Sequence, residues 1–248
     1  ANDSKVFGAT TTLASIAYIS GVAAGVSTGY TTSGLVNGDT ISSVTLTSTG
    51  ASATATVAGG PYTITPSALS GSTRTTADNY TITYSNAGTG LTVNKATLTV
   101  TADAKSMTYG DSSLPTFTAT IAGFVNSQVL ATSGVSGSAG LTTTATAYNG
   151  STAGSASVVG DYPITAAVGT LSASNYQFSY TNGTLSVGKA NLTITAANDS
   201  KVYGATTTAA SIAYTSGVAA GVSTGYTTSG LVNGDTISSI PLTSSGAT

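Results

Sequence analysis

The chain has 248 residues, with only 6 Lys or Arg, 8 acidic residues, no His and no Cys. This composition excludes imidazole chemistry, disulfides and thiolate metal sites, and six basic residues are too few to follow a nucleic-acid backbone. No apolar run approaches the roughly 18 residues of a membrane-spanning helix. Thirteen Tyr and a 40 % share of hydrophobic residues argue against disorder and for folded β structure.

The first 52 residues return almost unchanged as residues 197–248, at an offset of 196. The two stretches differ only at Phe7, Leu13, Ile19, Val44, Thr45, Thr49 and Ser52. A repeat of this length indicates a periodic protein made of tandem modules. We therefore expect neither end of the given sequence to be a natural terminus.

A second, weaker repeat lies inside the first. Residues 95–102 match residues 189–196, and both segments alternate apolar and polar side chains, which predicts a lead strand with one apolar face. An aromatic residue and a glycine follow a few residues later. These landmarks predict an A-type module over residues 1–94 that lacks its lead strand, a B-type module over 95–188, and a partial A-type module over 189–248.

Within a module, several alternating segments predict further strands. They are residues 53–57, 80–84, 117–121 and 176–180. Asn182-Gly183 predicts a two-residue hairpin turn, and residues 36–41 are the one place where a short helical turn is expected. About six or seven short strands per module predict an all-β fold of tandem Ig-like β-sandwich modules arranged as an extended rod. The alternative is a β-grasp-like module with one short helix.

No set of residues predicts a catalytic centre. Every acidic residue is an Asp beside Asn, Gly, Ser or Ala, a setting typical of turns. Calcium at a module junction is the sharper alternative, with Asp103, Asn198 and Asp199 as candidate ligands, because oxygen donors suit Ca²⁺. No other cofactor is expected. An intramolecular Lys-Asn isopeptide at Lys95 or Lys189 is disfavoured, because the chain has no Glu to assist it.

The tyrosines divide into two groups. Those in predicted strands are expected to pack in the core, with the hydroxyl bonded at the edge: Tyr62, Tyr80, Tyr84, Tyr162, Tyr176 and Tyr180. Three others lie in variable loops and are the candidates for contact with a ligand: Tyr18, Tyr30 and Tyr148.

The order of landmarks resembles a known family. After the lead strand come Tyr109-Gly110 with Pro115, then Gly-Phe/Leu-Val-Asn, Gly-x-Tyr-x-Ile, Asn-Tyr and Gly-Thr-Leu-x-Val. This set resembles the MBG repeat of the Tyr-Gly-x type across essentially the whole chain. The chain departs from the pattern in two places, since no Pro follows Phe7-Gly8, and Ser127-Gln128 replaces the Gly-Asp found at Gly38-Asp39.

The resemblance implies tandem extracellular β modules of very large bacterial secreted or surface adhesins, including filamentous-haemagglutinin-like proteins, and brings no catalytic residues. The expected function is therefore a stalk or fibre region of a giant adhesin or biofilm-matrix protein, and not an enzyme. A self-assembling filament or sheath subunit with strand pairing between chains is the alternative. Expected partners are neighbouring modules, identical chains in a fibre, and surface glycans or matrix polysaccharide. Nucleic acid is not among them.

Overall fold

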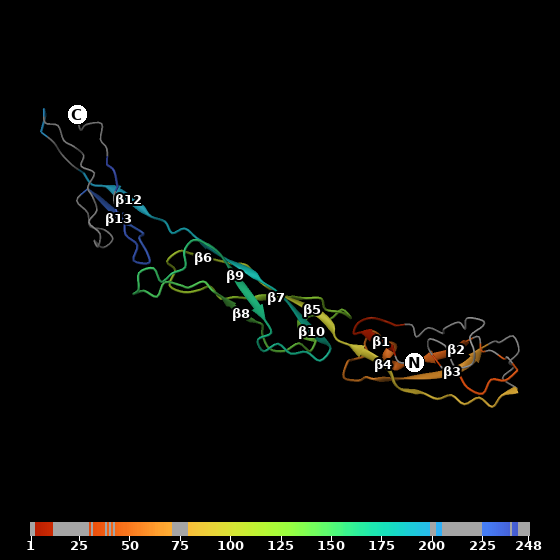
Figure 1. Ribbon diagram of the computed structural model, residues 1–248. Helices are drawn as coiled ribbons and strands as arrows, with labels where there is room; N and C mark the ends of the chain where they lie inside the picture. Colours follow the sequence, from red (N-terminus) through yellow and green to blue (C-terminus); the bar gives the residue numbers. More distant parts are fainter. Residues whose placement is uncertain are drawn as a thin grey trace. The chain divides into compact units, whose positions relative to one another are not determined.

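The computed structural model describes residues 3–11, 30, 32–37, 39, 41, 43–70, 79–198, 202–204, 225–238 and 240–242. Regular structure in these residues consists of strands and two short 3-10 turns (Figure 1), so the predicted all-β class is confirmed. The strands are β1 (Asp3–Val6), β2 (Ser43–Thr47), β3 (Tyr62–Ser70), β4 (Ala87–Asn94), β5 (Ala96–Ala102), β6 (Lys105–Thr108), β7 (Ala119–Ala122), β8 (Gly140–Thr143), β9 (Gly160–Ala167), β10 (Tyr176–Thr181), β11 (Gly183–Gly188), β12 (Thr193–Ala196) and β13 (Tyr226–Ser229). The 3-10 turns are η1 (Thr49–Ala51) and η3 (Leu130–Thr132).

The chain divides into two compact units, each built from separated segments. Unit 1 comprises residues 1–100, 121–139 and 168–180, and unit 2 comprises residues 101–120, 140–167 and 181–248. The division passes through the predicted B-type module, so each unit combines residues of that module with residues of an A-type module.

Unit 1 contains a four-stranded sheet in the order β1-β4-β3-β2, in which β1 runs parallel to β4 and the other pairs are antiparallel. A second sheet has the order β10-β5-β7. The predicted lead strand at β5 is confirmed, because every second residue from Ala96 to Ala102 is buried. The core of unit 1 joins side chains from both sheets with two from connecting segments: Phe7, Ala55, Val93, Ala96, Leu98 and Tyr176.

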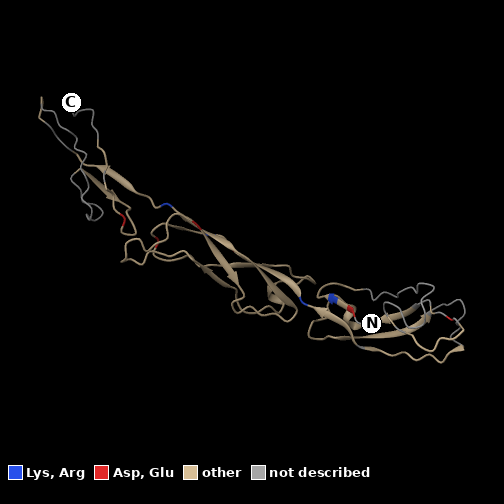
Figure 2. Ribbon diagram, in the orientation of Figure 1, with Lys and Arg blue, Asp and Glu red and all other residues tan. Residues whose placement is uncertain are grey.

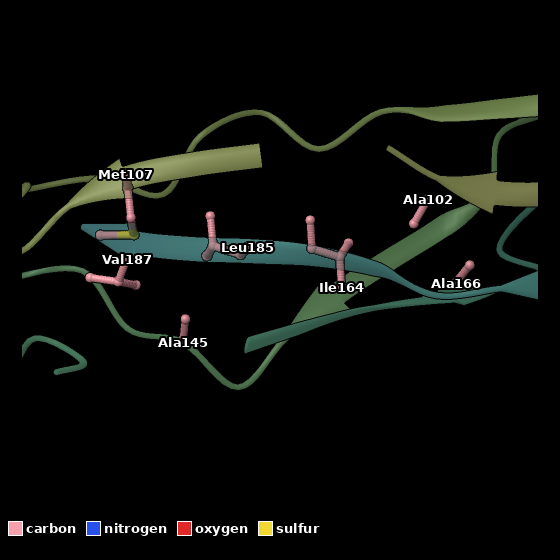
Figure 3. Packing of buried hydrophobic residues seen from close by; sticks show 7 residues of the cluster. All are labelled: Ala102, Met107, Ala145, Ile164, Ala166, Leu185 and Val187. Atoms are coloured by element: carbon pink, nitrogen blue, oxygen red, sulfur yellow. The ribbon is translucent and has the colours of Figure 1, made fainter. Parts of the chain in front are cut away.

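Unit 2 repeats the four-stranded sheet of unit 1, in the order β6-β11-β9-β8. Again the strand that comes first in the chain, β6, pairs in parallel with the last, β11. Leu185 and Ile164 are fully buried at the centre of its core, which Figure 3 shows together with Ala102, Met107, Ala145, Ala166 and Val187. The shared strand order supports the reading of the two segments as variants of one module.

The second lead strand is shorter than predicted. Residues 193–196 form β12, which pairs antiparallel with β13 through Ala196 and Tyr226. All four residues of β12 are exposed.

Three predictions of local structure are wrong. Residues 53–57 form turns instead of a strand, and residues 80–84 form no strand. Asn182-Gly183 makes no hairpin, because β10 pairs with β5 while β11 pairs with β6 and β9. The Asn182 side chain instead accepts a hydrogen bond from the backbone N–H of Ala166 at 3.1 Å.

Two further predictions hold in part. The strand expected at residues 117–121 is β7, which begins at Ala119. In the region of residues 36–41 the described backbone makes a single turn, closed by a 2.9 Å bond from Asp39 N to Val36 O.

The prediction that strand tyrosines have a bonded hydroxyl holds for Tyr62, Tyr80, Tyr84, Tyr162 and Tyr176, and the burial of the rings is uneven. Tyr176 is 1 % exposed, whereas Tyr84 and Tyr180 are 42 % and 37 % exposed. The hydroxyl of Tyr62 donates to Thr56 O and that of Tyr162 to Val158 O, both at 2.9 Å. Side-chain hydroxyls therefore tie loops to strands whether or not the ring is buried.

Charge is sparse on the fold, as the nearly uniform tan of Figure 2 shows. Charged side chains usually lie at the surface of a protein, but Lys5 is only 7 % exposed. Its ammonium group donates to the carbonyls of Ala9 (2.9 Å) and Ser52 (2.6 Å), and burial lowers its pKa. Lys5 pairs with Val93 as Met107 pairs with Val187, so a lysine occupies a core-facing position that holds methionine in the B-type module.

Candidate functional site: the joints between modules

The calcium candidates do not form a ligand cluster in the described part of the chain. Both oxygens of Asp103 accept hydroxyl hydrogen bonds, from Thr118 at 2.6 Å and Thr120 at 2.8 Å, and these bonds lower its pKa. Asn198 is exposed and Asp199 lies outside the described residues. Within the described ranges, no group of three acidic residues could hold a metal ion. Calcium binding therefore stays a prediction.

The three loop tyrosines have different settings. Tyr18 lies outside the described residues, and Tyr30 is half-buried with its hydroxyl shielded from solvent. Tyr148 is also half-buried, and its backbone N–H donates to Asp111 O at 2.8 Å. A role in ligand contact stays a prediction for all three.

The structure does bring together two landmark motifs that sequence reasoning treated as separate. The aromatic-glycine pair of one module, which we name the Tyr-Gly turn, meets the Gly-x-Val-Asn segment of the following module. We name residues 34–39, 123–128 and 230–235 the acceptor loops. The first joint, between residues 7–8 and 123–128, lies wholly in unit 1, and the second, between residues 109–110 and 230–235, lies wholly in unit 2.

Both joints use the same close backbone approach. A Cβ built on Gly8 would lie 2.5 Å from Val125 Cβ, and one on Gly110 would lie 2.5 Å from Val232 Cβ. The two glycines also share a φ of +87°, which L side chains rarely adopt. Only glycine satisfies both demands, so the Tyr-Gly motif is explained by the contact that it makes with the next module.

The acceptor loops share a second conformational feature. The asparagines Asn37, Asn126 and Asn233 all have φ of 55°, in the left-handed region that Asn tolerates better than most residues. This turn presents the preceding valine to the glycine of the other module. The Gly-x-Val-Asn motif is thus a turn whose shape serves the joint.

Aromatic packing dominates the first joint. The ring of Phe7 meets that of Tyr176 edge to face at 5.4 Å, and Phe124 meets the same ring at 6.0 Å. Such pairs contribute about 0.5–1.5 kcal/mol beyond their buried area. The Asn126 side chain donates to Ala53 O at 3.0 Å across the joint.

Hydrogen bonds dominate the second joint. Asn233 is 2 % exposed, and its side chain accepts from Ala156 N at 3.0 Å and donates to the Tyr109 hydroxyl at 2.7 Å. That hydroxyl in turn donates to Asp235 Oδ1 at 3.1 Å. Asparagine is strongly preferred at position 233, because the loss of either hydrogen bond would leave a buried polar group unpaired.

A tyrosine of the same module holds the acceptor loop in shape. Val125 N donates to the Tyr176 hydroxyl at 3.2 Å, and that hydroxyl donates to Gln128 at 2.5 Å. In the A-type module, Tyr80 bonds in the same way to Val36 N and, at 2.5 Å, to Asp39 Oδ2. The hydrogen bond to Asp39 raises the pKa of Tyr80.

The contacts at the two joints are those of docking between successive modules. The sequence reveals the Tyr-Gly and Gly-x-Val-Asn motifs because they keep their order in each module, but it does not show that they contact each other. The signal that could have paired them is that the glycine and the valine recur together in every copy, although neither lies in a predicted strand.

Comparison with known proteins agrees with these landmarks. The family model described as MBG domain (YGX type) matches residues 1–92 and again residues 98–186. This is a structural domain family found in the repeat regions of surface or secreted proteins. No curated protein and no solved structure matches the chain. Among the described residues, no helix has the length and apolar character to cross a membrane. The chain belongs to the MBG domain family of the YGX type.

Proposed function

We propose that this chain is part of the stalk of an extracellular bacterial adhesin or biofilm-matrix protein, in which repeated modules hold an adhesive region away from the cell. The stalk itself performs no catalysis. Its function is to set the distance between the cell and the adhesive region and the direction in which that region points.

The observation that carries this proposal is the repetition of one joint. The same glycine-valine contact occurs between the first and second modules and between the second and third. In a protein whose modules contact only their neighbours, length increases with the number of copies. A joint with buried contacts also fixes how successive modules meet, which a flexible linker would not do.

The direct contacts across the first joint fit an external location. They are aromatic pairs and hydrogen bonds between neutral groups. Such contacts are little affected by ionic screening, so a change of external salt leaves them intact.

Small-angle scattering tests the proposal. The given chain is compared with one in which residues 53–248 are added again after Thr248, which continues the 196-residue period. We expect the largest dimension to grow in proportion to the added modules and to be independent of protein concentration. An unchanged largest dimension would contradict the stalk. Growth with concentration would favour the filament alternative.

The adhesive role is tested separately in cells. Deleting whole 196-residue periods from the gene should reduce attachment or aggregation while surface expression is kept. Normal attachment at every length would refute that role and leave the spacer role standing.

A further inference from the structure

The acceptor loop of the first A-type module has the same form as the two docked loops and a different exposure. Val36 is 57 % exposed, whereas Val125 and Val232 are half-buried against a glycine of the preceding module. The turn is nevertheless formed, with Asn37 at the same φ of 55° as in the docked loops. The loop therefore has the docking shape before any partner is present.

The side chains at the end of each acceptor loop indicate which partner it fits. In the first joint this residue is Gln128, whose single amide oxygen accepts the hydroxyl of Tyr176. The incoming aromatic residue there is Phe7, which has no hydroxyl to place. The neutral amide oxygen of Gln128 thus bonds the tyrosine of its own module, and the incoming residue at this loop is one that needs no acceptor.

The A-type loops carry a carboxylate at the same position, with two acceptor oxygens. In Asp39, Oδ2 accepts the hydroxyl of Tyr80 from its own module. In Asp235, Oδ1 accepts the hydroxyl of Tyr109 from the preceding module. The two aspartates are equivalent in the 196-residue repeat, so each displays one half of a single arrangement.

We propose that the Gly34–Asp39 loop is a docking site for the Tyr-Gly turn of a B-type module placed before it in the same polypeptide. Asp39 then accepts two tyrosine hydroxyls, one from Tyr80 on Oδ2 and one from the incoming tyrosine on Oδ1. The pairing of Tyr with Asp, and of Phe with Gln, selects which module type docks on which loop.

This assignment goes beyond the stalk proposal, because it names a docking site, its occupant and the residues that give specificity. It holds whether or not the protein mediates adhesion. Hydrogen bonds between hydroxyl and carboxylate are stronger than neutral ones, which gives the matched pair its advantage over Phe with Asp.

Thiol labelling provides the test, because the chain has no cysteine. Three single variants, Val36→Cys, Val125→Cys and Val232→Cys, place a thiol at the same point of each loop. In the given chain we expect Val36→Cys to react with a soluble disulfide reagent about tenfold faster than the other two, whose loops must open first. Equal rates would overturn the proposal.

The second arm adds the proposed occupant. A copy of residues 95–196 is placed before Ala1, so that Ala196 precedes Ala1 as it precedes Ala197 in the chain. We expect labelling of Val36→Cys to slow about tenfold, to the rate of Val232→Cys. The matched control carries Gly110→Ala in the added copy and should restore fast labelling. Tyr109→Phe in the added copy should give an intermediate rate, and Asp39→Asn should do the same.

Two outcomes would overturn the proposal in this arm. Fast labelling that persists after the extension would show that the loop does not receive the turn. If labelling of the unextended chain slows as its concentration rises, the loop is occupied by a second copy of the chain and not by a preceding module. Circular dichroism of each variant confirms that the modules remain folded.

Discussion

The two joints combine the same backbone contact with different side-chain chemistry. In both, a glycine with φ of +87° lies against a valine of the next module. At the positions of Phe7, Phe124 and Gln128 in the first joint, the second joint has Tyr109, Leu231 and Asp235. The rings of Phe7 and Phe124 pack edge to face on Tyr176, whereas Tyr109 hydrogen bonds to Asn233 and Asp235.

The comparison separates the residues that give every joint its shape from the residues that determine which modules join. The glycine and the left-handed asparagine occur in both joints and give the common shape. The aromatic residue and the residue at the end of the acceptor loop vary together. Substitutions at shared positions should therefore weaken either joint, and substitutions at varying positions should affect one joint alone.

The largest effect is expected from Tyr176, which supports the first joint through both its ring and its hydroxyl. Tyr176→Ala should lower the free energy of unfolding of unit 1 by about 3–5 kcal/mol, as for other buried aromatic residues. Tyr176→Phe keeps the ring contacts but leaves Val125 N and Gln128 without their partner, and should cost about 1–3 kcal/mol. Denaturant unfolding measures both. Equal losses would mean that the rings contribute nothing beyond the hydroxyl.

Gly110→Ala should disrupt the second joint and lower the free energy of unfolding of unit 2 by about 2–5 kcal/mol. The loss adds overpacking against Val232 to the cost of a positive φ for alanine. Gly204→Ala is the matched control, since Gly204 has φ of +81° and a Cβ built on it meets none of the described residues within 4 Å. It should cost only the conformational part, about 1–2 kcal/mol. Denaturant midpoints that fall equally would refute the contact as the reason for glycine.

Asn233→Ala should destabilise by about 2–3 kcal/mol, because it leaves Ala156 N and the Tyr109 hydroxyl without their bonds to a buried amide. Asn126→Ala should cost about 1 kcal/mol, since the exposed Asn126 makes a single bond, to Ala53 O. Hydrogen exchange at β1 and β6 reports the two joints separately. A larger loss for Asn126→Ala would reverse the assignment of polar and aromatic joints.

The smallest effect is expected from pH, and it lies outside the joints. Hydroxyl bonds from Thr118 and Thr120 hold the pKa of Asp103 below its ordinary value of 3.8. Asp103 therefore stabilises unit 2 above pH 3.8, and this contribution is lost as the pH falls through the lower pKa of the folded state. Asp103→Asn should flatten the acid side of a melting-temperature profile for unit 2. An unchanged profile would contradict the role of this carboxylate.

Sequence alternation predicted the strands that lie inside sheets and failed where the same alternation serves a joint. β5 and β10 follow the pattern because one face is buried against the core. Residues 53–57 alternate too, yet Ala55 is buried beneath the joint and Ala53 O accepts from Gly8 N and Asn126. In residues 53–57 the alternation marks the buried Ala55, and it does not report whether the backbone pairs with a strand.

The turn signal at Asn182-Gly183 failed for a related reason. Asparagine and glycine favour tight hairpins, but here a Cβ at Gly183 would lie 2.9 Å from the Ala102 carbonyl carbon, so glycine is required by a close strand crossing. The side chain of Asn182 is used to cap Ala166 N. Both residues are explained by long-range contacts that a local pattern does not contain.

The burial of Lys5 is a feature that the repeat alone could have predicted. Aligning Phe7 with Tyr109 places Lys5 at the position of Met107, an apolar residue that faces the core of unit 2. The joints could not be predicted in this way, because a repeat identifies recurring residues without showing that the Tyr-Gly turn of one copy contacts the acceptor loop of the next.

The parallel pairing of the first and last strands of each four-stranded sheet has a mechanical consequence. In unit 2 the chain enters this sheet at Lys105, opposite Leu185, and leaves it at Gly188, opposite Thr108. Tension applied at these two points pulls β6 and β11 along their lengths in opposite directions, so the bonds of the ladder bear the load together instead of opening one at a time. β1 and β4 have the same arrangement in unit 1. A sheet connected in this way resists stretching most strongly along the line in which a tethered chain would be pulled.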